Sequence, residues 1–76
     1  VHLRDLDETV AQAMEMMTPA HREAFRMGVL EGRPYSEIAR LTGWSLAQVK
    51  INIYRARKTA IAEIRRRGLV DEEPKP

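Results

Sequence analysis

The stretch from Tyr35 to Lys58, YSEIARLTGWSLAQVKINIYRARK, contains two helical patterns separated by a short turn. The first, over residues 35-42, is about two turns long and ends before Gly43, which suits the left-handed conformation that closes many helices. Ser45 follows as an N-cap, because its hydroxyl can accept a hydrogen bond from a backbone N–H of the next helix. A short helix, a turn and a longer helix form the layout of a helix-turn-helix.

The longer helix combines an apolar stripe with a polar face. Apolar residues recur at every third or fourth position, the spacing of a helix face that packs on a core. The residues of this stripe are Leu46, Val49, Ile53, Ala56, Ala60 and Ile64. The pattern predicts a helix over residues 46-67, about 33 Å long at about 1.5 Å per residue. Gly68 suits the position after its end, and Leu69 is expected to contact Ile64 in a Schellman motif.

Two more helices are predicted upstream. The first covers about residues 6-16, because Asp5 and Glu8 have the spacing of a capping box and apolar residues then recur at helical spacing. The second covers about residues 19-31 and ends before a glycine. Thr18 suits its N-cap, and the proline that follows suits the first helical position, where a missing N–H costs nothing. The sequence therefore predicts an all-α domain of four helices.

Chain length and composition restrict the function. The 76 residues suffice for one small domain, predicted over residues 1-70, and leave little room for a deep catalytic cleft. The charged, proline-rich end at 71-76 is expected to be disordered. Without cysteine, the sequence has neither a disulfide frame nor a thiolate metal site. No apolar run approaches the roughly 18 residues of a membrane helix, so we expect a soluble, cytoplasmic protein without membrane insertion.

Nothing in the sequence indicates an enzyme. The only imidazoles are His2 and His21, and no nucleophile motif or glycine-rich phosphate loop is present. The acidic residues Asp5, Asp7 and Glu8 lie at a predicted helix start, where negative charge is favourable without any metal. We therefore expect neither a metal site nor a cofactor.

Charge is distributed unevenly along the chain. Residues 1-38 hold four basic and seven acidic residues, a net charge of −3, whereas residues 39-70 hold eight basic and one acidic residue, a net charge of +7. Such asymmetry indicates an anionic partner for the second half, although a solvated helix face would give the same composition. The arginines at 65-67 also favour the negative end of a helix dipole, which is a structural reason for their position.

The polar face of helix 46-67 supplies the candidate contacts to such a partner. The residues left outside the apolar stripe over its first half are Ala47, Gln48, Lys50, Ile51, Asn52, Tyr54, Arg55, Arg57 and Lys58. In a helix-turn-helix, the first turns of the second helix contact base edges in the major groove.

Each type of side chain on this face suits a different DNA contact. The amides at 48 and 52 match adenine, while Lys50 and Arg55 match guanine or phosphate. Arg57 and Lys58 point further round and are expected to contact phosphates, and the small residue at 47 would let the helix N-terminus approach one. The tyrosine at 54 either donates to a phosphate or packs, partly buried, against the first helix.

These features resemble region 4 of bacterial sigma factors of the extracytoplasmic-function group, over the stretch from Met17 to Lys58. The shared motifs, in order, are RE at 22-23, LEG at 30-32, YSEIA at 35-39, Gly43, VK at 49-50 and IYRARK at 53-58. The resemblance implies that helix 46-67 recognises the −35 element of double-stranded promoter DNA. It also implies that the domain sits on the β flap of the RNA polymerase core.

Three positions depart from the family pattern. Ile51 and Asn52 replace the usual Ser-Arg, which removes a cation from the face that meets the bases. Ile51 either packs on a thymine methyl or marks a surface covered by a partner protein, and Asn52 suits adenine. Pro34 replaces a capping serine, so Glu37 loses its capping-box partner. Trp44 replaces a smaller aliphatic residue and is expected to cover the core between the third and fourth helices.

A protein-interaction module is the main alternative function. Helix-turn-helix domains also serve as docking surfaces, and the resemblance implies an anti-sigma factor as a further partner. The exposed apolar residue expected at Ile51 favours this interpretation. The two functions are compatible, because an inhibitor can act by covering the surface that meets DNA or polymerase.

Overall fold

The computed structural model describes residues 3–68, with the side chains of residues 6–68. Every regular element in this part of the chain is helical, which confirms the all-α prediction. The elements are α1 (Leu3–Glu15), α2 (Pro19–Phe25), the π-helical segment η1 (Arg26–Leu30), α3 (Tyr35–Thr42) and α4 (Leu46–Arg66). The expected tail at 71-76 lies outside the described residues.

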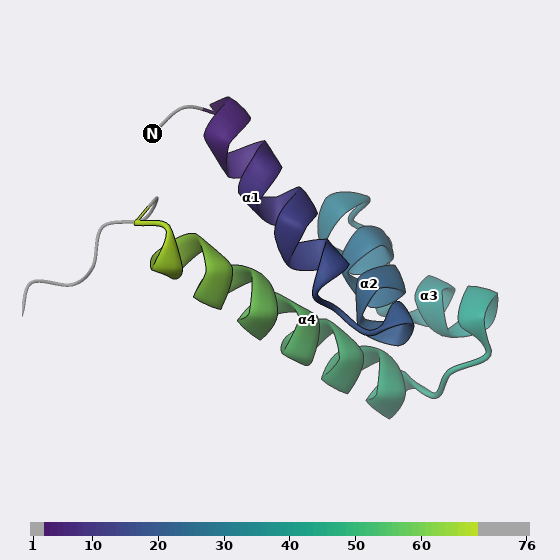
Figure 1. The fold of residues 1–76 in the computed structure, drawn as a ribbon. Helices are drawn as coiled ribbons and strands as arrows, with labels where there is room; N and C mark the ends of the chain where they lie inside the picture. The colour runs from purple at the N-terminus through teal and green to yellow at the C-terminus, as the bar shows by residue number, and fades with distance from the viewer. Residues whose placement is uncertain (1–2, 69–76) are drawn as a thin grey trace, which may run out of the picture.

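Helix α4 extends along the molecule, and the other helices pack on its inner side. Figure 1 shows α1 and α2 beside its middle, with α3 near its first turn. The turn between α3 and α4 contains Gly43, whose φ of 82° is the left-handed conformation predicted for it. Its backbone N–H donates to the Ala39 carbonyl at 2.8 Å and closes α3. The helix-turn-helix predicted from the sequence is therefore present.

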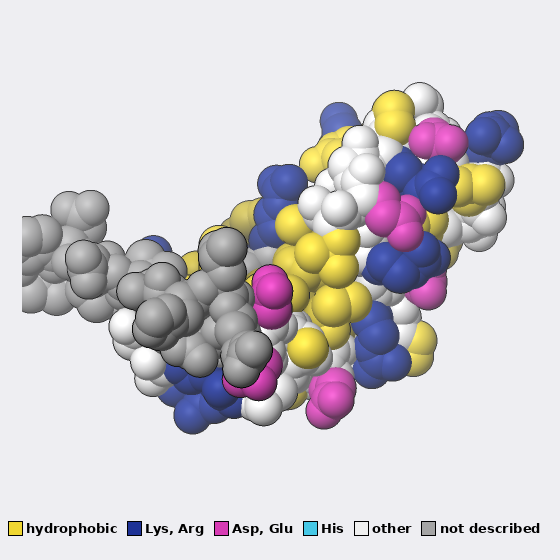
Figure 2. All heavy atoms as spheres, turned by 90° about the horizontal axis from the view of Figure 1, so that it is seen from above, with side chains coloured by type: hydrophobic (Ala, Val, Ile, Leu, Met, Phe, Trp, Pro, Cys, Tyr) yellow, Lys and Arg dark blue, Asp and Glu magenta, His cyan; other side chains and the backbone are white. Residues whose placement is uncertain are grey.

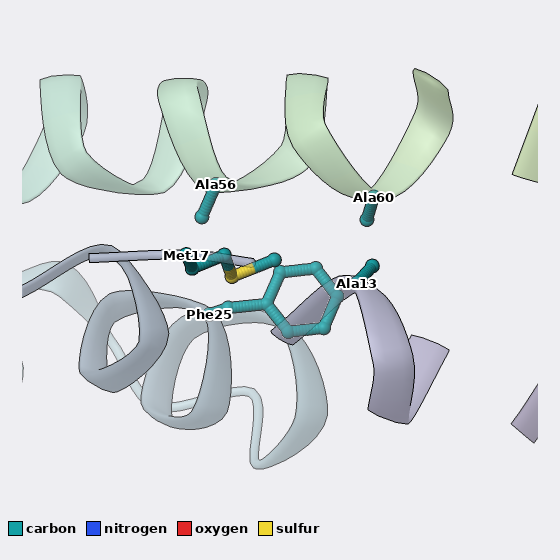
Figure 3. Packing of buried hydrophobic residues seen from close by; sticks show 5 residues of the cluster. All are labelled: Ala13, Met17, Phe25, Ala56 and Ala60. Carbon is teal, nitrogen blue, oxygen red and sulfur yellow. The ribbon is translucent and has the colours of Figure 1, made fainter. Parts of the chain in front are cut away.

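The core consists of two clusters that share α4. The first contains Ala13, Met17, Phe25, Ala56 and Ala60. In Figure 3 the larger side chains of this cluster lie between α4 and the helices opposite, where the alanines of α4 leave room for them. The second cluster contains Ala24, Met27, Ile38, Val49 and Ile53. Four residues of the predicted stripe, at positions 49, 53, 56 and 60, are thus confirmed as core.

The two ends of the predicted apolar stripe, Leu46 and Ile64, are less buried than its middle. Leu46 is 51% exposed and belongs to neither cluster, so its prediction as core was wrong. It is the first residue of α4, and periodicity alone does not show where the neighbouring helices end. Trp44 covers this end of the core instead: it is half-buried and packs on the second cluster, as predicted. Ile64 is half-buried, and its expected contact Leu69 lies outside the described residues.

Helix α1 begins at Leu3, three residues earlier than predicted, so Asp5 lies inside the helix and is not its N-cap. The capping-box signature is local, and no helix-breaking residue precedes it to stop the helix there. The other end of α1 is closed by Arg22, whose Nε donates to the Met14 carbonyl at 2.9 Å. Its Nη2 donates to the Met17 carbonyl at 3.2 Å.

The second predicted helix starts as expected but changes its hydrogen bonding halfway. The Thr18 hydroxyl accepts from the His21 N–H at 3.2 Å, which confirms the predicted N-cap. From Arg26 onward the turns widen to a π-helix that ends at Leu30, so the helix predicted over about residues 19-31 is present but changes its type within that range. The two helix types differ by one residue in hydrogen-bond register, which side-chain periodicity does not resolve.

Candidate nucleic-acid interface

The exposed start of α4 is held by a capping box. The Ser45 hydroxyl accepts from the Gln48 backbone N–H at 3.1 Å, and the Gln48 Oε1 accepts from the Ser45 N–H at 2.8 Å. These two bonds satisfy backbone donors that the first turn of a helix leaves without partners. The start of α3, in contrast, has no side-chain cap because Pro34 occupies the N-cap, as predicted. Glu37 accepts from Arg33 at 3.3 Å instead.

All eight predicted contact residues lie on α4 outside its buried stripe. Seven are exposed, and Asn52 is half-buried. They occupy the first three to four turns, from Ala47 to Lys58, which is the part of α4 that follows the helix-turn-helix turn. Ile51 is 40% exposed, so an apolar side chain does stand on this surface.

The cations of this surface differ from most other described cations because no described carboxylate pairs with them. Within the part of the chain that the structure describes, no carboxylate lies within salt-bridge distance of Lys50, Arg55, Arg57 or Lys58. We call these four residues the α4 cations. Five other arginines are paired with carboxylates, namely Arg26, Arg33, Arg40, Arg66 and Arg67. The positive charge of α4 therefore remains available to an external anion.

One of the α4 cations is supported by an aromatic ring. Lys58 Nζ lies 5.6 Å from the centroid of the Tyr54 ring, a distance at which the ring face attracts a cation. Tyr54 is itself 57% exposed, which is against the second of the two alternatives for it, partly buried packing on the first helix. Tyrosine and lysine stand together on the outer face, one helical turn apart.

A comparison with known protein families shows to which family the domain belongs. A family model described as sigma-70, region 4 matches residues 7–59, well over half of the 76-residue chain. The chain belongs to the sigma-70 region 4 family. Region 4 is the DNA-binding part of a transcription initiation factor involved in recognising the promoter −35 element, and it is not an enzyme family. No curated protein and no solved structure gives a match.

Region 4 of this chain has a second notable surface, an apolar groove of about 350 Å³. Its lining comes from α1, α2, η1 and α4 and consists of Leu6, Val10, Phe25, Val29, Leu30, Arg57, Ala60, Ile61 and Ile64. Apolar side chains also gather on the surface seen from above in Figure 2, between basic and acidic ones. The groove includes Arg57, so this predicted phosphate contact stands at the border between the groove and the outer face of α4.

The last turn of α4 in this region 4 domain is held by a buried carboxylate that sequence analysis missed. Glu63 is only 3% exposed and accepts from Arg67 Nε at 2.9 Å and from the Arg66 guanidinium. These hydrogen bonds, Arg66 first, hold the Glu63 pKa at about 2, below its ordinary 4.5. The Arg67 guanidinium also donates to Gln12 of α1 and so connects the two helices. Arg66 and Arg67 therefore have a structural role, as expected. They fulfil it by pairing with Glu63, in addition to the favourable position at the end of the helix dipole.

The described residues also bear on membrane-spanning helices and metal-binding groups. Between residues 3 and 68, no helix is long and apolar enough to cross a bilayer. Among the described side chains, those of residues 6–68, no group of three or more histidine, cysteine, aspartate or glutamate residues could hold a metal ion.

Proposed function

We propose that α4 lies in the major groove of the −35 element, as the DNA-recognition helix of a sigma factor of the extracytoplasmic-function group. The observation that supports this most is the set of α4 cations, which are exposed on the face that a helix-turn-helix presents to DNA and pair with no carboxylate of the described residues. Phosphates would supply the missing counter-charges. The domain would act in the cytoplasm, where bacterial chromosomes are transcribed.

Different residues of this face have different proposed tasks. Lys50 and Arg55 contact guanine or phosphate, and Lys58 contacts phosphate while stacked on Tyr54. The half-buried Asn52 lies at the flank of the face, where it suits adenine at the edge of the contact. Ile51 lies on the same face of α4, and its apolar side chain suits contact with a thymine methyl. Ala47 lets the first turn of α4 approach the DNA backbone.

The apolar groove is the proposed docking site for a helix of the polymerase β flap. A helix with an apolar stripe would cover the groove, whose edge residues Leu30 and Ile61 are about half exposed. The α4 residues that line the groove begin at Arg57, whereas the proposed base contacts lie before that residue. Both partners could therefore bind at once, as promoter recognition on polymerase requires.

Binding to DNA duplexes at several salt concentrations tests the main proposal. If the four α4 cations each neutralise a phosphate, the affinity should fall about 100-fold for a fourfold rise in salt. Fluorescence anisotropy of the 76-residue chain with a labelled duplex pool measures this slope. A salt-independent affinity would contradict the DNA contact assigned to these residues.

A role as a protein-interaction module is the second candidate, and the exposure of Ile51 favours it. An anti-sigma factor that packs on this residue would exclude DNA from the same face. Ile51→Glu should then abolish binding of such an inhibitor to the chain. If inhibitor binding persists and only DNA binding changes, the apolar residue serves DNA recognition.

A further inference from the structure

Gln48 takes part in two tasks at once, because it belongs both to the capping box and to the surface proposed to meet DNA. Its side-chain Oε1 accepts from the Ser45 backbone N–H at 2.8 Å, and its own backbone N–H donates to the Ser45 hydroxyl at 3.1 Å. The residue is nevertheless exposed. The side chain is therefore held in place before any DNA arrives.

The capping bond determines which end of the amide faces outward. A backbone N–H can only donate, so the atom that meets the Ser45 N–H must be the amide oxygen. The Nε2 group points away from this bond, and none of the described residues is recorded as its hydrogen-bond partner. Gln48 thus presents two donors outward while its acceptor is turned toward the helix N-terminus.

This orientation changes the base that Gln48 suits. A glutamine contacts adenine in the major groove by accepting from N6 and donating to N7 with both ends of its amide. Guanine presents two acceptors there, O6 and N7, and thymine presents O4. We propose that Gln48 acts as a fixed hydrogen-bond donor that selects a keto base, guanine above all. This inference rests on the proposed contact between α4 and DNA. The sequence alone had suggested adenine for this residue.

Gln48→Glu tests the proposal while keeping the helix cap. Glutamate is a natural member of the capping box, so one carboxylate oxygen can still accept from the Ser45 N–H. The other oxygen then faces the DNA as an acceptor, which suits the N4 amino group of cytosine. We expect the preference at one position of the bound sequence to change from guanine to cytosine, by about 2- to 10-fold in affinity.

Selection from a randomised duplex pool, followed by sequencing, measures this change for the wild-type chain and the variant. Ala62→Glu is the matched control, because it adds the same charge to an exposed position further along α4. It should weaken all duplexes alike and change no base preference. Circular dichroism of both variants checks that the helix content is preserved.

Ser45→Pro is a second, independent variant. Ser45 has a φ of −70°, which proline adopts, but proline has no N–H to hold the Gln48 oxygen. The freed amide should accept adenine at the same position.

The outcomes are distinct. A wild-type preference for adenine at the position that Gln48→Glu alters, or a variant that alters no position of an otherwise clear motif, would overturn the assignment of Gln48 alone. A wild-type chain that enriches no motif would overturn the proposed DNA recognition itself, and the assignment with it.

Discussion

Gly28 of η1 lies close to the Ile53 side chain of α4. A Cβ placed on this residue would lie 2.6 Å from Ile53 Cδ1 and 3.1 Å from Cγ1, and the Ile53 side chain is fully buried. The glycine is therefore needed for its small size, within a helical segment that would otherwise favour alanine. Sequence analysis missed it, because only the neighbouring helix reveals the lack of space.

Gly28→Ala should lower the free energy of unfolding by about 1 to 2 kcal/mol, since overpacking costs more than the better helix propensity of alanine returns. Urea denaturation followed by circular dichroism measures the change. Ile53→Val removes the Cδ1 atom that would clash, so it is the matched second variant. The double variant should be less destabilised than the two single changes added together, and simple additivity would argue against the close contact.

At the scale of elements, α4 was the helix best predicted from sequence. Its start agrees with the prediction because Ser45 and Gln48 form a capping box that depends only on neighbouring residues. Its first apolar residue, Leu46, was misassigned because exposure depends on where α3 ends. The eight candidate contacts all lie on the predicted face of α4, but the cap that occupies the Gln48 oxygen became visible only in three dimensions.

Two substitutions on α4 separate base recognition from positioning. Arg55→Ala should weaken binding by about 1 to 3 kcal/mol and relax the preference at one base pair, because an arginine that contacts a base edge specifies it. Lys58→Ala should weaken binding to all sequences alike, because a phosphate contact contains no sequence information. Anisotropy titrations with four duplexes that differ at one base pair distinguish the two. Uniform effects from both variants would assign Arg55 to phosphate.

At the scale of the whole molecule, the groove and the DNA-facing surface should be separable by mutation. Ile61→Glu places a charge at the edge of the apolar groove and should weaken capture of the chain by RNA polymerase core about tenfold or more. It should change binding to promoter duplex by less, because the proposed base contacts end before Ile61. Thr59→Glu, on the opposite flank of the buried α4 stripe, is the charge control. Equal losses for both variants would show that the groove is not the docking site.

The contact between α1 and the C-terminal end of α4 was the part of the fold least accessible to sequence analysis. Arg67 and Gln12 are 55 positions apart in the chain, and no local pattern joins them. Glu63 holds Arg67 in place by accepting a hydrogen bond from it. In the sequence, however, Glu63 is a single acidic residue near several arginines, and nothing there indicates that it is buried. Its burial follows from its place on the inner side of α4, in line with the alanines of the core.

This contact should make the stability of the domain depend on acid. The Glu63 pKa in the folded chain is about 2, below the ordinary value of 4.5, so folding favours the charged carboxylate. Its contribution is complete above about pH 4.5 and is lost as the pH falls toward about 2. Thermal melts of the wild type should therefore show a falling midpoint through this range.

Glu63→Gln should lower the midpoint at pH 7 and flatten its decline in acid, because the variant has no carboxylate to protonate at this buried position. A variant whose midpoint declines as steeply as that of the wild type would mean that other carboxylates, such as Glu31 beside Arg33 and Arg26, account for the acid sensitivity.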